Sequence, residues 1–163
     1  MPGPVNTPVR KMLNAGVPVG LGVASSASND GAHMFNEARQ ALLLARVGRS
    51  LKPFGCDHGP AKMPVRNVLE IATRGGAQVL GRSDIGHLAL GMCADLALFE
   101  QPTLPFAGGA VHHPVGSLLL CASAQAAYTV VNGRVVVREG QLVTVELGPL
   151  VERHNRLALL LAG

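Results

Sequence analysis

The first part of the chain pairs a short apolar run with a longer amphipathic stretch. Residues 17–23 are almost entirely apolar and are bounded by turn-forming residues, which is typical of a buried strand in a parallel sheet. The small polar residues 24–32 follow, and they predict a loop in which Asn29 or Asp30 caps the next helix. Residues 33–47 repeat apolar side chains at helical spacing and predict that helix.

A connector rich in glycine and proline separates this strand–helix unit from a second predicted helix. The connector covers residues 48–62, which is long for a compact domain and favours a lid or a mobile loop. The second helix is expected at residues 64–74, because Pro64 suits its first position and Gly75 suits its end. A short helical piece is expected to continue through residues 77–80.

After Gly81 the pattern changes to short alternating runs that indicate antiparallel strands. Asn132 and Gly133 lie between two runs of valine, and this dipeptide is the strongest short-range signal for a β-hairpin. A single parallel strand has no neighbour to pair with, and a small sheet with one helix is only marginally stable. The elements therefore look like pieces of two layers whose other strands and helices lie elsewhere. The elements predicted here are a strand at 94–100, a hairpin at 127–137, a strand at 141–147 and a helix at 149–161.

Composition narrows the functional classes. The chain has 163 residues, of which 48% are hydrophobic and 15% charged, and this predicts a folded domain. The net charge of +4 is scattered and only 3% of the residues are aromatic, which argues against nucleic-acid binding. No apolar run reaches the roughly 18 residues of a membrane span. Three cysteines without a CxxC spacing indicate a reducing compartment, so we expect a cytoplasmic location.

Three stretches, taken in their order and spacing, resemble the metal-dependent amidohydrolase superfamily. Residues 72–81 are similar to a conserved helix of that family, and residues 85–99 to the passage from its barrel to its β-sandwich. Residues 130–140 are similar to its late hairpin. Within the superfamily, residues 20–31 together with residues 39–44 look most like 8-oxoguanine deaminases and hydroxyatrazine-type aminohydrolases, in which the first of these stretches is the loop after barrel strand eight.

The resemblance implies an α/β fold that is incomplete in this chain. A whole (β/α)₈ barrel takes about 250 residues, so only its last strand–helix unit is expected here, with the C-terminal part of the composite β-sandwich. Residues 1–82 would be the C-terminal remnant of the metallo-dependent hydrolase barrel. Residues 83–147 would be a partial β-sandwich, and residues 148–163 a C-terminal helix. We therefore expect a truncated hydrolase whose other barrel strands would precede residue 1.

The resemblance also implies hydrolytic deamination of a purine or triazine-like ring by a metal-activated water. In full-length relatives, zinc or iron is held by an HxH pair, two further histidines and an aspartate after strand eight. This sequence has no HxH, and Ala24 occupies the position of the aspartate, with Ser25 in place of a glycine. A methyl group binds no metal, so we expect no catalytic residue and no metal or other cofactor here, and no activity of the chain alone.

Four polar residues of the loop match the relatives. The resemblance gives Ser26, Ser28, Asn29 and Asp30 a role in lining the substrate pocket at the C-terminal face of the barrel. Capping of the next helix is the alternative role for Asn29 and Asp30. Asp30 lies six residues beyond Ala24, too far along the loop to replace the missing ligand.

Other side chains of metal-ligand type are interpreted as surface residues. The run Cys-Asp-His at residues 56–58 holds three ligand types, but adjacent residues cannot close a tetrahedral site without help from elsewhere. His112 and His113 could supply that help, although we expect them as a polar surface pair in a connector between sandwich strands. Cys93 is expected to act as a small buried apolar side chain.

Two alternatives to an inactive fragment stay open. The chain is half of a split enzyme whose other polypeptide supplies the missing strands and histidines, or it is a non-catalytic binding module. The module would associate through unpaired strands, including self-association. The partner implied for full-length relatives is a small-molecule ring amine, either 8-oxoguanine, a hydroxytriazine or another such ring, and no nucleic-acid or membrane partner is expected.

Overall fold

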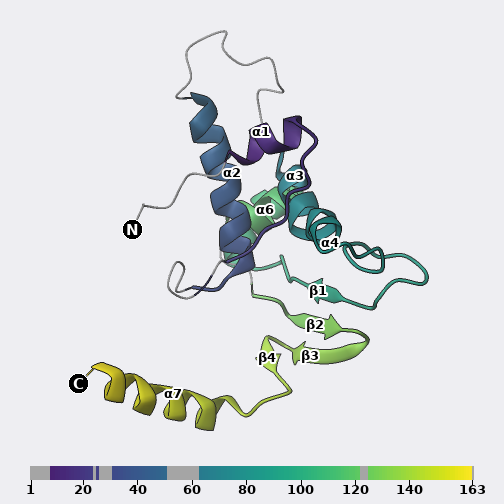
Figure 1. The fold of residues 1–163 in the computed structure, drawn as a ribbon. Coiled ribbons are helices and arrows are strands. Elements are labelled where there is room, and N and C mark those ends of the chain that lie inside the picture. Colours follow the sequence, from purple (N-terminus) through teal and green to yellow (C-terminus); the bar gives the residue numbers. More distant parts are fainter. Residues whose placement is uncertain (1–7, 24, 26–30, 51–62, 122–124, 163) are drawn as a thin grey trace. The chain divides into compact units, whose positions relative to one another are not determined.

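The chain forms two compact units in the computed structural model (Figure 1). The structure describes residues 8–23, 25, 31–50, 63–121 and 125–162. The first unit comprises Met1–Met92 and Gln101–Ala124, and the second comprises Cys93–Glu100 and Gln125–Gly163. The chain therefore enters the second unit, returns to the first and enters the second again.

The described part of the first unit is helical. Its helix α2 confirms the helix predicted at 33–47, and a helix at 64–74 is also present. Gly75 does not end that helix, because its backbone stays helical (φ −63°, ψ −44°) and the chain continues into α4. The elements are α1 (Val9–Asn14), α2 (Met34–Ser50), α3 (Val65–Glu70), a π-helical turn η1 (Ile71–Gly75), α4 (Gly76–Val79), a 3₁₀ turn η2 (Leu104–Phe106), α5 (Gly109–His112) and α6 (Pro114–Leu120).

The core of the first unit forms where α2, α3 and α6 meet (Figure 1). Leu42, Val68 and Leu119 are its largest fully buried side chains, one from each helix. The helix α6 is not predicted from the sequence, because seven residues are too few for a helical repeat to stand out. The buried cluster consists of Val19, Ala38, Leu42, Met63, Val65, Val68, Ile71 and Leu119.

The strand predicted at residues 17–23 is not formed. Only Val19 of this segment is buried, and no strand of the described chain pairs with it. A parallel strand needs a neighbouring strand for its hydrogen bonds, and the described segments around it are helices. The segment instead lies against η1 and α4.

Glycines make this contact sterically feasible. A Cβ atom on Gly75 would overlap the carbonyl oxygen of Val19, and a Cβ on Gly20 would stand 3.1 Å from the Cα of Gly76. Because the neighbouring atom is a backbone atom in both cases, neither glycine can be replaced by a residue with a side chain unless the backbone moves. Gly75 is therefore required for packing, which explains why a residue that usually ends helices lies inside one.

The second unit contains a four-stranded antiparallel sheet in the order β1-β2-β3-β4. It confirms the predicted strand at 94–100 and the hairpin at 127–137, and the residues of both turns, Asn132-Gly133 and Glu139-Gly140, have positive φ. The strand predicted at 141–147 is much shorter: β4 ends at Leu142, residues 143–146 form no strand, and the helix that follows begins at Leu147. The elements are β1 (Leu96–Leu98), β2 (Tyr128–Val131), β3 (Arg134–Arg138), β4 (Gln141–Leu142) and α7 (Leu147–Ala162).

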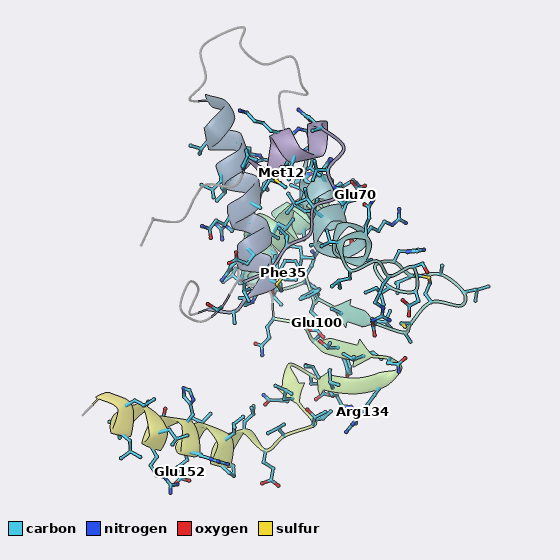
Figure 2. All side chains as sticks on the ribbon, viewed as in Figure 1. Met12, Phe35, Glu70, Glu100, Arg134 and Glu152 are labelled. Carbon is cyan, nitrogen blue, oxygen red and sulfur yellow. The ribbon has the colours of Figure 1, made fainter. Side chains whose placement is uncertain are left out.

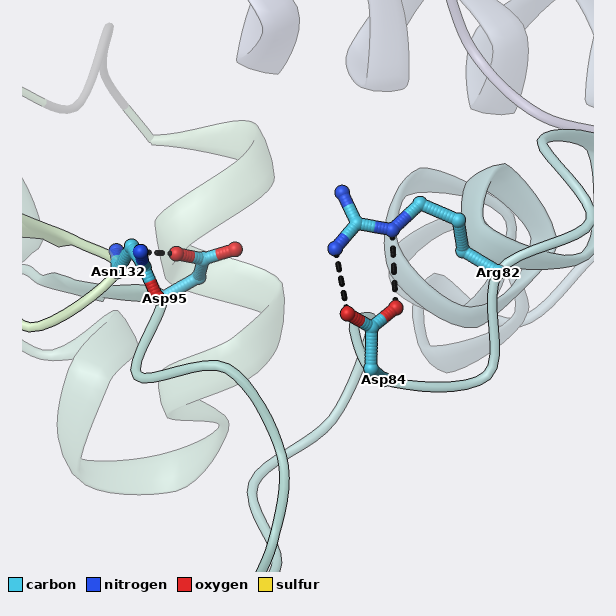
Figure 3. A network of polar contacts seen from close by, with 4 residues as sticks. All are labelled: Arg82, Asp84, Asp95 and Asn132. Atoms are coloured by element: carbon cyan, nitrogen blue, oxygen red, sulfur yellow. Dashed lines mark hydrogen bonds and ion pairs between the residues drawn. The ribbon is translucent and has the colours of Figure 1, made fainter.

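Asp95 joins the entry of β1 to the β2–β3 turn. Its Oδ1 accepts a hydrogen bond from the backbone N–H of Asn132 at 2.7 Å (Figure 3). Beside it, the backbone N–H of Gly133 donates to the carbonyl of Ala94 at 3.0 Å. These two bonds hold the positive-φ turn in place, so two of the stretches that carry the family resemblance contact each other.

The helix α7 differs from the other long helix, α2, in its burial. All of its described side chains are exposed, including Leu157 and Leu161. An ion pair between Glu152 and Arg156, with 3.7 Å between nitrogen and oxygen, lies along its polar side. Every helix in the described part of the chain is too short or too polar to cross a membrane.

Replacing Gly75 by alanine tests the contact with residue 19. We expect Gly75→Ala to lower the free energy of unfolding by about 1–3 kcal/mol, because the new methyl group overlaps the Val19 carbonyl. Gly22→Ala is the matched control, since a Cβ there meets open space, and its effect should stay within about 0.5 kcal/mol. Urea unfolding followed by far-UV circular dichroism measures both, and equal losses would contradict the packing role.

Substitution of Asp95 tests the turn anchor. Asp95→Ala removes the acceptor for the Asn132 N–H and should cost about 1 kcal/mol, whereas Asp95→Asn keeps an acceptor oxygen and should cost less. Amide exchange at Asn132, measured by NMR, should rise in the alanine variant. Asp84→Ala, which breaks an exposed pair with Arg82, should leave that exchange unchanged; a response there would argue against a specific anchor.

Candidate functional site

The predicted substrate loop is held at both of its ends by described residues. On the entering side, Gly20 packs on Gly76 of α4. On the leaving side, Ala32 adopts a positive φ of 42°, and α2 then begins at Met34. The carbonyl of His33 accepts hydrogen bonds from the backbone N–H groups of the next turn, so the start of α2 fixes where the loop ends.

The predicted loop residues themselves are not among those that the structure describes. Ala24, Ser26, Ser28, Asn29 and Asp30 lie outside the described ranges, so the role of each stays a prediction. Ser25 is described and is exposed. The Cys-Asp-His run at 56–58 also falls outside the described part.

His33 is a polar residue near this loop, and from the sequence alone we expect it only as part of the first turn of the helix that follows. Its Nδ1 is buried and has no hydrogen-bond partner among the described residues. The ring lies 6.4 Å from the ring of Phe35, tilted by 59°. Figure 2 marks Phe35 at the start of α2. A buried nitrogen without a partner costs roughly 1–3 kcal/mol. Nε of Arg10 is the other buried side-chain atom of this kind among the described residues. No signal in the sequence distinguishes His33 from an ordinary first-turn histidine.

The described residues do not fit a metal centre. No group of three or more His, Cys, Asp or Glu side chains within the described ranges is placed to hold an ion. His112 and His113 are exposed in the connector between β1 and β2, as predicted, but His113 serves as a helix cap. Cys93 is only half-buried, in contrast to the burial expected, and like the exposed Cys121 it is not part of a disulfide.

The ion pair between Arg82 and Asp84 has a structural role. Arg82 donates from Nε and Nη2 to the two carboxylate oxygens of Asp84, at 2.9 and 2.6 Å (Figure 3). Both side chains are about half exposed, so solvent screens the charges. Gly86 follows with a φ of +93°, and a Cβ there would stand 3.0 Å from that of Ala77. The pair therefore stabilises a tight turn on α4, and it offers no acid–base chemistry.

A concavity of about 580 Å³ lies on the segment 101–111 of the first unit. Its lining is mostly apolar, with Gln101 and Thr103 as polar side chains and with no histidine, cysteine or carboxylate. Such a lining supplies neither a nucleophile nor a proton donor for catalysis. The candidate site therefore remains the loop between Gly20 and His33.

Comparison with known proteins gives a consistent family. A family model described as "Amidohydrolase family" matches residues 4–142. The chain is 43% identical over 157 residues to an 8-oxoguanine deaminase from Pseudomonas aeruginosa, and this covers 96% of the chain and 32% of the relative. It is 38% identical to a 5-methylthioadenosine/S-adenosylhomocysteine deaminase from Desulforudis audaxviator, over 93% of the chain and 33% of the relative. The resemblance inferred from the motifs is thus confirmed.

Solved structures agree with the sequence comparison. The fold is similar to the crystal structure of atrazine chlorohydrolase from Arthrobacter aurescens complexed with zinc, with a TM-score of 0.79 and 34% identity. The similarity covers 92% of this chain and 32% of that one. The chain therefore spans about a third of the length of the curated relatives and of the solved structure that it matches.

Proposed function

Because this chain belongs to the amidohydrolase family, we propose that it is the C-terminal part of an enzyme that hydrolytically deaminates a purine or triazine-like ring. The identity of 43% to an 8-oxoguanine deaminase, across nearly the whole chain, carries this proposal. The similarity to a zinc-bound triazine-type hydrolase supports a metal-dependent reaction in the complete enzyme. In that enzyme the metal would supply an activated water, and no step of the reaction is assigned to the described residues.

The two compact units support a division of roles within such an enzyme. The helical first unit would be the end of the hydrolase barrel, with residues 24–30 at its active face. The antiparallel sheet of the second unit would be part of the β-sandwich, and α7 would close the chain. The proposed pocket residues are Ser26, Ser28, Asn29 and Asp30, because residues 20–31 resemble the corresponding loop of the relatives. The described contacts at Gly20 and His33 flank this segment.

We further propose that the chain alone is inactive. The relatives' aspartate position holds Ala24, and no HxH motif occurs in the sequence. The described histidines, cysteines and carboxylates form no cluster that would replace those ligands. A water molecule without a metal or a general base is not a nucleophile for an aromatic ring carbon at neutral pH, so turnover should be absent.

Assay of the purified chain tests this proposal. We expect no ammonia release from 8-oxoguanine above the background rate, and well below one zinc or iron per chain by elemental analysis. The 8-oxoguanine deaminase of Pseudomonas aeruginosa, measured in parallel, is the positive control. Ammonia release that a chelator abolishes would show that this chain holds a working site.

A split enzyme is the second candidate function, and the segment 18–23 favours it. Its backbone groups form no hydrogen bond with another described residue, although Val19 is buried. Free N–H and C=O groups along such a segment suit the addition of strands from a second polypeptide. A partner with the remaining strands and histidines would then complete the fold, but Ala24 would still leave one ligand missing.

Complementation tests the split enzyme and the role of Ala24 together. The chain would be co-expressed with the part of the Pseudomonas aeruginosa deaminase that precedes the matched region. We expect the double variant Ala24→Asp/Ser25→Gly to retain more zinc in the co-purified complex than the unsubstituted chain does, because a carboxylate returns to the ligand set. If neither the unsubstituted chain nor the double variant co-purifies with the added part, the split enzyme is contradicted. Equal zinc in both complexes would show that Ala24 does not limit metal binding.

A further inference from the structure

The turn between β2 and β3 contains a dipeptide that can undergo an intramolecular reaction. Asn132 and Gly133 are both exposed, with φ of 47° and 80°, and they join Val131 of β2 to Arg134 of β3. Among the asparagines of the sequence, only Asn132 is followed by glycine. Glycine has no side chain that shields its own backbone nitrogen, so this nitrogen can attack the side-chain amide of the asparagine before it.

The reaction converts the side-chain amide into an acid and releases ammonia. A hydroxide ion removes the proton of the Gly133 N–H, and the nitrogen then attacks Cγ of Asn132. The new N–Cγ bond forms, the Cγ–Nδ2 bond breaks, and Nδ2 leaves as ammonia after it takes a proton from water. Water then opens the resulting succinimide at either carbonyl, which leaves aspartate or isoaspartate at residue 132. No oxidation or reduction takes place, and water and hydroxide are the co-reactants.

Two hydrogen bonds restrain the first step in the folded chain. The N–H of Gly133, whose proton must leave, donates to the carbonyl oxygen of Ala94 at 3.0 Å. The N–H of Asn132 donates to Oδ1 of Asp95 at 2.7 Å, and this bond fixes the residue that is attacked (Figure 3). Because hydroxide removes a hydrogen-bonded amide proton only after the bond opens, the turn must open locally before the nitrogen can attack.

We propose that Asn132 is a site of spontaneous deamidation, and that the bonds from the turn to Ala94 and Asp95 set its rate. These residues all belong to the second unit, so the restraint is local. None of the described strands β1 to β4 contains a buried side chain. Packing therefore gives the hairpin little resistance to opening, and the two hydrogen bonds are what hold the turn closed.

The products change both the length and the charge of the turn. Isoaspartate leads the main chain through its side-chain carbon and lengthens the connection between Val131 and Arg134, which are paired directly across the hairpin. A two-residue turn with both residues at positive φ does not accommodate this extra atom. Either product also adds a carboxylate at the residue that Asp95 contacts, and the like charges repel each other. Deamidation therefore removes the anchor that restrains it.

Ageing of the purified full chain in mildly alkaline buffer, followed by peptide mass spectrometry, tests the proposal. The mass gain that accompanies conversion of an amide to an acid should appear at Asn132 before it appears at any other asparagine. The folded chain should react more slowly than the chain in urea, where the bonds to Ala94 and Asp95 are absent. Amide exchange of Gly133, measured by NMR, should follow the deamidation rate, because both processes remove the same proton.

Variants of the anchor separate the turn from the rest of the fold. Asp95→Ala should raise the deamidation rate of the folded chain about fivefold, the factor that corresponds to the loss of one hydrogen bond. Asp95→Asn keeps an acceptor oxygen and should give a smaller increase. Asp84→Ala is the matched control, since the Asp84 carboxylate pairs with Arg82, and it should leave the rate unchanged. In urea all of these chains should deamidate at the same rate.

Three results would overturn the proposal. The first is an asparagine other than Asn132 that reacts before it. The second is an equal rate in the folded chain and in urea, which would mean that the turn is not restrained. The third is an Asp95→Ala variant whose folded rate is unchanged, or whose rate rises equally at Asn67 of α3, because an equal rise would assign the effect to general unfolding.

Discussion

The contact of one backbone with another at Gly75 is the constraint on which the first unit depends. The carbonyl oxygen of Val19 occupies the space that a side chain on residue 75 would need. The following residue, Gly20, lies close to the Cα of Gly76 in the same way. The π-helical turn η1 ends at this contact, and such turns appear mostly as single-turn bulges inside α-helices. The apolar segment, anchored by the buried Val19, thereby enters the predicted substrate loop at a defined point.

The motifs that indicated the family are also the places where backbone segments meet. Gly75 and Gly76 of the first stretch contact residues 19 and 20, and Gly86 of the second stretch contacts Ala77. Asp95 links the second stretch to the turn of the third. Side chains at these positions are limited to glycine or to a specific hydrogen-bond acceptor, and this limited choice is what made the family recognisable in a single sequence.

Local features were predictable and features that depend on distant contacts were not. The helix α2 and the Asn132-Gly133 hairpin follow from spacing and turn chemistry within a few residues. Gly75 was expected to end a helix because its partner, Val19, lies far away in the sequence. The strand at 17–23 failed for the same reason, since a strand exists only through its neighbours. For the candidate site, the sequence supports loop residues by resemblance, whereas the unpaired ring nitrogen of His33 is visible only in three dimensions.

The order in which the chain visits its two units has a consequence for synthesis on the ribosome. Leu119 completes the core of the first unit, so that core cannot close until α6 has emerged, long after α2 and α3. By then β1 has also been made, and its partner β2 follows α6 by only a few residues. The sheet of the second unit should therefore begin to pair soon after the core of the first unit closes, and the early helices must wait with apolar faces open to chaperones.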